Sequence, residues 1–326
     1  MSDPSIPVVD VRDWHGDAAA RARFVRGVGE SLADIGFFAL ANHGIAPAET
    51  QRAYATAREF FALPAATKAR YHRAGAKGQR GYTGFGTEHA KDAKAADLKE
   101  FWQVGRVDVP DDHEVHQPFG PNLWPDADVP AFQPVMSALY RGLDGLGAIC
   151  LEAAALYLGE PADTFAAMAT DSDTIVRVIY YPPTAGAPAG AVRSAAHEDI
   201  NLITLLSGAT ADGLELLRRD GTWMPVHVSF DHIVVDSGDM LQNLTGWNAS
   251  DVIVKSPQIS LSNLVGRIYD AGRSKILHGT HVDRTISFAD ERRYATTLAG
   301  IALRGCVIRL AKYTGPDVDT AFRTIS

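Results

Sequence analysis

Two side chains, those of His197 and Asp199, have the types and the spacing that metal binding requires. They are two residues apart, and the apolar run Ile203–Leu206 that follows is typical of a strand. On an extended strand, residues two apart point to the same face. An imidazole and a carboxylate on one face supply two of the three ligands of a facial Fe(II) site, which leaves other positions open. The sequence therefore predicts a metal site here, completed by a distant third ligand.

The composition is that of an ordinary globular protein with an acidic balance. The chain has 326 residues, 46% of them hydrophobic, and a net charge of −8. This charge argues against nucleic acid or an anionic membrane as the main partner. The two cysteines, Cys150 and Cys306, are too few for a disulfide framework and favour a reducing, cytoplasmic location. The sequence shows no signal peptide and no run long enough to cross a bilayer.

The elements that would position these ligands begin with a helical N-terminal half. Apolar residues at helical spacing, such as Phe24, Val28 and Leu32, predict the first long helix. The predicted helices cover residues 17–34, 47–63 and 130–158. The predicted strands of this half cover residues 6–11, 36–40 and 101–104. Residues 72–98 are rich in Gly, Ala and Lys without a clear period, which predicts a surface loop.

From residue 174 onward the pattern changes to short strands separated by turn residues. The predicted strands lie at 175–181, around His197, and at 213–217, 223–226 and 233–236. Short strands at such close spacing indicate a sandwich or jelly roll. From about residue 259 the pattern is helical again, and residues 294–313 predict an amphipathic helix in place of closing strands. Without closing strands the sheets would have exposed edges that need cover.

A series of separate motifs occurs in a fixed order between residues 5 and 246. The series includes Ile6–Asp10, Gly36–Ile45, Phe60–Pro64 with Lys68, Gly81–Tyr82, Lys99–Phe101, Arg177–Pro183, His197–Asp199, Gly213–Leu216, Gly221–Val226 and Gly238–Gln242. Each motif is weak alone, but the ordered series is specific. In these motifs the chain resembles the isopenicillin N synthase-type family of 2-oxoglutarate/Fe(II)-dependent oxygenases.

This resemblance implies both a fold and an activity. The fold would be of the α+β class, a double-stranded β-helix (jelly roll) with flanking N-terminal helices, here followed by a helical C-terminal segment. The activity would be that of an oxidoreductase that uses Fe(II), 2-oxoglutarate as cosubstrate and O2 to oxidise a small molecule. His197 and Asp199 match the family's metal loop, and Tyr181 matches a position that can contact the cosubstrate. The alternative for Tyr181 is an aromatic residue of the sandwich core.

The resemblance ends after Gly246. The family continues with a third histidine ligand and an Arg-x-Ser pair that binds the distal carboxylate of 2-oxoglutarate, whereas residues 254–259 here contain neither His nor Arg. Only His278 and His281 follow residue 232, and His281 precedes Arg284 and Ser287 in an order that echoes the family's. His281 is therefore our candidate for the third metal ligand, and a solvated turn histidine is the alternative.

The tail itself is similar to the end of HEPN-type helical domains. The mark of that family is an Arg followed after four to six residues by His, and Arg273 and His278 have four residues between them. We therefore divide the chain into an N-terminal dioxygenase-type region at 1–110, an oxygenase core at 111–247 and a tail at 252–326. The tail indicates either a fusion near 247–252 or a highly divergent oxygenase end.

Two other functions compete with the active oxygenase. The missing third histidine fits a non-catalytic oxygenase-like protein whose tail binds a protein partner. The Arg273 and His278 pair fits a HEPN-like ribonuclease, although the acidic balance and the short tail argue against work on RNA.

Overall fold

The computed structural model describes most of the chain up to residue 245 and two short segments of the tail. The described residues are 6–87, 99–117, 119–170, 172–181, 199, 201–207, 214–217, 222–226, 230–245, 307–314 and 322–324. His197 and His281, the first and third proposed metal ligands, therefore lie outside the described residues, as do Arg273 and His278.

The centre of the fold is an eight-stranded mixed sheet. Its strand order is β1-β2-β9-β6-β10-β5-β4-β3. The bounds are β1 Val8–Asp10, β2 Phe37–Ala41, β3 Gly81–Thr83, β4 Glu100–Val104, β5 Ile175–Tyr181, β6 Ile203–Ser207, β9 His232–Ser237 and β10 Val307–Thr314. The sheet thus joins strands from all three predicted segments of the chain. The division of the chain at 110/111 and at 247–252 stays a prediction.

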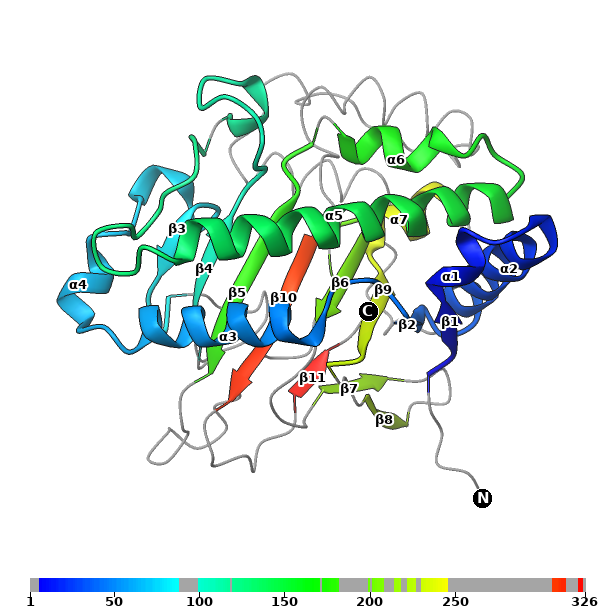
Figure 1. Cartoon of the computed structure of the whole chain (residues 1–326), viewed down its shortest axis with the longest axis horizontal. Coiled ribbons are helices and arrows are strands. Elements are labelled where there is room, and N and C mark those ends of the chain that lie inside the picture. The colour runs from blue at the N-terminus through cyan, green and yellow to red at the C-terminus, as the bar shows by residue number, and fades with distance from the viewer. Residues whose placement is uncertain are drawn as a thin grey trace, which may run out of the picture.

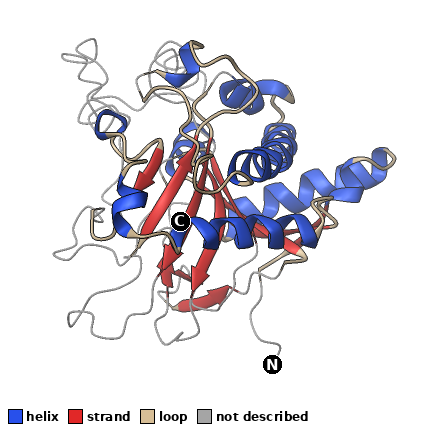
Figure 2. Cartoon of the chain, turned by 60° about the vertical axis from the view of Figure 1, so that its left-hand side comes forward, coloured by secondary structure: helices blue, strands red, loops and turns tan. Residues whose placement is uncertain are grey.

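Helices cover one face of this sheet, as Figures 1 and 2 show. The long ones are α2 Ala18–Asp34, α3 Pro47–Phe61 and α5 Phe132–Tyr157, which confirms all three predicted helices. The shorter ones are α1 Val11–Trp14, α4 Ala65–Ala69, α6 Asp163–Thr170, α7 Asp239–Thr245 and the 3₁₀ turns Ala74–Ala76 and Glu114–His116. Each long helix buries its apolar stripe, and together with alternate strand residues these stripes form the larger hydrophobic core. None of the helices in the described part of the chain is long and apolar enough to cross a membrane.

A second, three-stranded sheet faces the other side of the main sheet. Its order is β11-β7-β8, with β7 Leu214–Leu217, β8 Trp223–Val226 and β11 Phe322–Thr324. Leu214, Leu216 and Met224 of this sheet share a core with Leu206 and Val234 of the main sheet. The two sheets therefore form a sandwich with helices outside it, in agreement with the predicted α+β class.

The tail differs from its prediction. Residues 307–314 form β10, not the end of an amphipathic helix, and residues 322–324 form β11, so the helical C-terminal segment is wrong at both places. β10 pairs in parallel with β5 on one side and β6 on the other. Without it, both neighbours would present unpaired edges, and pairing there outweighs the helical spacing of the segment. The predicted exposed edge at this position is therefore filled.

The predicted surface loop at 72–98 is also wrong in its described first part. Gly81–Thr83 is β3, which pairs with β4, and Arg80, Tyr82 and Thr83 are buried. The short apolar signal of a three-residue strand is too weak to recognise without its partner strand.

Candidate active site

Asp199 lies buried four residues before the first residue of β6, with 4% of its surface exposed. The Thr204 hydroxyl of β6 donates a hydrogen bond to Oδ2 of Asp199, and the same hydroxyl oxygen accepts one from Nδ2 of Asn201, at 2.9 Å. The three side chains therefore form a short, buried relay. Sequence reasoning missed Thr204 and Asn201, although polar residues at the start of an otherwise apolar strand are the signal that could have identified them.

The alternation of β6 shows where this relay points. Ile203 and Leu205 pack in the core beneath the helices, whereas Leu206 packs in the core between the two sheets. Because strand residues two apart share a face, Thr204 lies on the same face as Leu206. Its cross-strand neighbour on β9 is Asp236, which is also buried. The site thus lies on the inner face of the sandwich, at the start of β6.

The donor chemistry of Asp199 fits a ligand of Fe(II). A carboxylate oxygen is one of the ligand types of the facial site, and a bound divalent cation would offset the cost of burying this charge. The described residues contain no group of three His, Cys, Asp or Glu side chains that could hold a metal. Within that part of the chain, Asp199 is the one member of the predicted ligand set, because His197 and His281 lie outside it.

Tyr181 ends β5 and is 1% exposed. It forms a small apolar cluster with Phe101 and Ile179. Arg177 of β5 lies two residues before Ile179 and four before Tyr181, so it shares their face of the strand. Its guanidinium carbon is 4.4 Å from the centroid of the Phe101 ring. This packing supports the core role of Tyr181, and its contact with the cosubstrate stays a prediction.

Two buried polar atoms lie beside this cluster. In the register of β3, β4 and β5, Thr83 is opposite Phe101, and Gln103 is opposite Arg177. Oε1 of Gln103 and Oγ1 of Thr83 have no hydrogen-bond partner among the described residues, although Nε2 of Gln103 donates to Gln79 at 3.0 Å. Buried polar atoms are rarely left unpaired, so this part of the sheet is a candidate for contact with a ligand.

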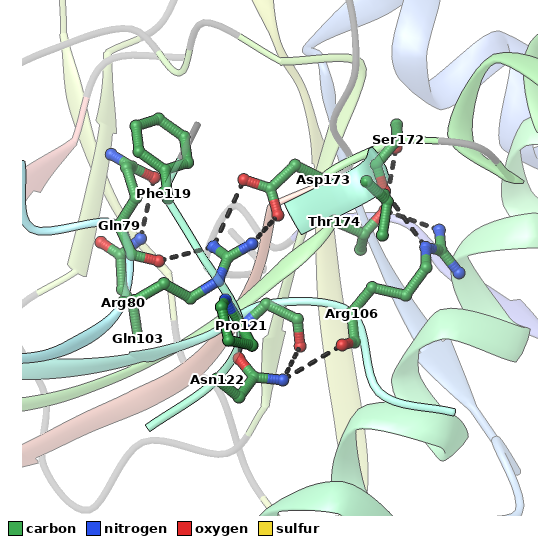
Figure 3. Close-up of polar contacts among 12 residues, drawn as sticks. Gln79, Arg80, Gln103, Arg106, Phe119, Pro121, Asn122, Ser172, Asp173 and Thr174 are labelled. Carbon is green, nitrogen blue, oxygen red and sulfur yellow. Dashed lines mark hydrogen bonds and ion pairs between the residues drawn. The ribbon is translucent and has the colours of Figure 1, made fainter. Parts of the chain in front are cut away.

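A buried ion pair fixes the ends of β4 and β5 (Figure 3). The fully buried Arg80 guanidinium contacts the carboxylate of Asp173, which lies two residues before the start of β5. A Cβ atom at Gly105, which follows β4, would overlap this guanidinium and displace it from its place beside Asp173. Asn122 accepts a hydrogen bond from the Gly105 amide at 2.6 Å. These contacts hold the two strands that position Gln103 and Tyr181.

A second polar group in Figure 3 secures the same end of the fold. The Arg106 guanidinium donates to the carbonyl oxygens of Ala169 at 2.6 Å and Ser172 at 3.1 Å, which ties the chain after β4 to the end of α6 and to the segment that follows it. Arg106 also donates to the hydroxyl of Thr174 at 3.3 Å. The role of this group is structural.

Two family models match the chain. The one described as non-haem dioxygenase in morphine synthesis N-terminal matches residues 6–127, and the one described as 2OG-Fe(II) oxygenase superfamily matches residues 172–252. The second match includes residues 197–199, where the sequence predicts the metal ligands, the sandwich strands β5 to β9 and helix α7.

Curated relatives and solved structures agree with these matches. The 2-oxoglutarate-dependent dioxygenase traH of Penicillium crustosum is 31% identical over 255 residues, which cover 75% of this chain and 77% of the relative. A 2OG-Fe(II) oxygenase family protein of Caulobacter crescentus has a similar structure, with a TM-score of 0.64, 41% identity and coverage of 73% of this chain and 75% of its own. A full-length Neurospora crassa protein in complex with alpha-KG gives a TM-score of 0.65, 26% identity and coverage of 75% and 76%.

Proposed function

The chain belongs to the 2-oxoglutarate/Fe(II)-dependent oxygenase family, and from this membership we propose that His197 and Asp199 are two protein ligands of its iron. As a member, it is an oxidoreductase that uses Fe(II), 2-oxoglutarate and O2 on a small-molecule substrate, with the α+β jelly-roll fold. The observation that supports the ligand proposal most directly is the buried Asp199 carboxylate on the inner face of the sandwich.

The protein's own residues prepare the site for this chemistry. Bound iron would supply the oxidative decarboxylation of 2-oxoglutarate to succinate and CO2, coupled to oxidation of the substrate. Asp199 would hold the metal through a carboxylate oxygen, and its burial keeps bulk water away from that bond. Tyr181 would contact the cosubstrate from the inner face of β5. The third ligand in this proposal is His281.

The location of the protein in the cell and a partner for its tail are also proposals. The low number of cysteines supports a cytoplasmic location. Burial raises the pKa of the Cys150 thiol to about 12, so this thiol is unreactive. A protein partner for the tail at 252–326 is proposed from the departure of that segment from the family pattern.

Ligand substitution tests the metal site. We expect the purified protein, loaded anaerobically with Fe(II), to release succinate when 2-oxoglutarate and O2 are added with a panel of small-molecule substrates. Asp199→Ala and His197→Ala should abolish both succinate release and tight Fe(II) binding, because two remaining ligands hold the metal weakly. Exposed residues of the same types provide controls, and Asp34→Ala and His15→Ala should keep full activity. Unchanged iron binding in Asp199→Ala would show that the ligand assignment is wrong.

The two tail histidines allow a matched test of the third ligand. If His281 completes the site, His281→Ala should weaken Fe(II) binding by at least about tenfold, whereas His278→Ala should leave it unchanged. Equal binding by these two variants and the parent would remove His281 from the ligand set. Parallel titrations of the parent give the reference affinity.

A further inference from the structure

Thr204 contacts the proposed metal ligand through a hydrogen bond whose direction is fixed. A hydroxyl has one proton to donate, and its oxygen can accept. Asn201 donates its Nδ2 proton to the Thr204 oxygen at 2.9 Å, and the Thr204 proton is then directed to Oδ2 of Asp199. Because the acceptor is a carboxylate, this is a charge-assisted hydrogen bond, which is stronger than one between neutral groups.

Burial keeps the Thr204 hydroxyl in this orientation. Thr204 is 0% exposed and Asn201 is 3% exposed, so water does not compete for either group. Thr204 is also β-branched, and its χ1 angle is restricted on a strand. The hydroxyl therefore presents one fixed donor to Asp199.

The backbone around α7 holds Asn201 in turn. The Asn201 carbonyl oxygen accepts a hydrogen bond from the Met240 amide at 3.1 Å. The Leu202 carbonyl oxygen accepts one from the Gly238 amide at 2.9 Å. A Cβ atom at Gly238 would overlap both the carbonyl oxygen and Oδ1 of Asn201, so the glycine permits this close approach. The relay is thus anchored to the segment between β9 and α7.

We propose that Thr204 is a positioning residue for the metal site: its hydroxyl occupies Oδ2 of Asp199 and directs Oδ1 to bind the iron as a single-oxygen ligand. This inference rests on the proposed role of Asp199. A carboxylate whose one oxygen accepts this hydrogen bond offers its other oxygen more readily to the metal, which favours a single-oxygen ligand over chelation and leaves an additional coordination position open. Residues that orient a ligand in this manner typically change metal affinity by about 10–100-fold when they are removed.

Binding of Mn²⁺, which replaces Fe²⁺ without oxidation by air, tests this role independently of turnover. In calorimetric titrations of the full chain, Thr204→Val should raise the dissociation constant of Mn²⁺ about 10–100-fold, because valine keeps the shape and loses the donor. Thr204→Ser, which retains the hydroxyl, should remain within about threefold of the parent. Thr174→Val is the matched control, since Thr174 is equally buried but its hydroxyl contacts Arg106 outside the site. It should bind Mn²⁺ as the parent does.

A second variant tests the same relay if Thr204→Val does not fold. Asn201→Ala removes the donor that orients the Thr204 hydroxyl and should weaken Mn²⁺ binding in the same direction. With Co²⁺ as the probe, the visible absorption bands should shift in Thr204→Val and stay in place in Thr204→Ser, because the bands report how the carboxylate binds.

The outcomes separate this inference from the function on which it rests. Parental Mn²⁺ affinity in Thr204→Val, or an equal loss in Thr204→Ser, would overturn the positioning role while Asp199→Ala still abolishes binding. Equal binding by the parent and Asp199→Ala would overturn both, because Asp199 would then not be a ligand.

Discussion

At the scale of single residues, two opposite charges are buried together beneath the helices. Lys68 and Glu100 are 8% and 6% exposed and form an ion pair at 2.8 Å. The Lys68 ammonium also donates to the Phe61 carbonyl at 3.0 Å, and the Tyr82 hydroxyl donates to Glu100. Burial, together with the hydrogen bond to Glu100, raises the pKa of Tyr82, which stays protonated and keeps donating. This group links α3, α4, β3 and β4.

Breaking that pair from one side should be strongly destabilising. We expect Lys68→Met to lower the free energy of unfolding by about 3–5 kcal/mol, because it leaves the Glu100 charge buried without its cation. The double variant Lys68→Met with Glu100→Gln should recover part of this loss, since no charge remains. Unfolding in urea measures both. As a control, Arg12→Met removes an exposed ion pair with Asp10 and should cost less than about 1 kcal/mol. A double variant no more stable than Lys68→Met would contradict this account.

At the scale of elements, β10 is the piece that completes the main sheet. It is parallel to both of its neighbours, whereas the pairs β2–β9, β6–β9 and β4–β5 are antiparallel. Because β10 pairs with a strand on each side, its backbone hydrogen bonds to both neighbours, as that of a central strand does. β11 differs, because among the strands that the structure describes it pairs with β7 alone, at the edge of the small sheet.

This difference predicts unequal effects of proline. Leu310→Pro removes a backbone donor from the middle of β10, and proline is poorly tolerated in central strands, so we expect a clear fall in melting temperature and a tendency to aggregate. Phe322→Pro at the first residue of the edge strand β11 should have a smaller effect. Calorimetry and light scattering measure both properties. Equal melting temperatures for the two variants would show that β10 does not complete the sheet in solution.

At the scale of the whole molecule, three layers determine what is buried. The helices cover one face of the main sheet (Figure 1), and the small sheet packs against part of the other through a shared core. Two histidines, His43 and His116, are also buried. Burial lowers the pKa of His43, helped by nearby His232, and burial lowers the pKa of His116, helped by the charge of Arg80.

These two histidines should make the fold less stable in mild acid. Their folded-state pKa values lie below the ordinary value of about 6.5, so the unfolded chain binds more protons as the pH falls below that value. Their contribution to stability should therefore be full above about pH 6.5 and decrease below it, and melting temperatures at about pH 7.5 and 5.5 measure the decrease. In His116→Gln the decrease should be smaller, whereas in His15→Gln, which alters an exposed histidine, it should equal that of the parent. An unchanged decrease in His116→Gln would contradict the assignment.

The sequence by itself determined the features that depend on local pattern. The long helices followed from apolar spacing, and the family followed from short motifs in order, because each of these signals lies within a few consecutive residues. The metal ligands His197 and Asp199 stay a proposal drawn from the same motifs. The comparisons confirm the family, the activity class and the cofactors.

Only the tertiary structure decided which distant residues meet. The partnership of Lys68 with Glu100, the burial of residues 80–83 and the place of residues 307–314 between β5 and β6 depend on contacts between segments far apart in the chain. The role proposed for the Thr204 hydroxyl also depends on tertiary structure, because this hydroxyl contacts both Asp199 and Asn201, and the segment after β9 holds Asn201 in place. Strand order and side-chain pairing of this kind follow from packing that local propensity does not encode.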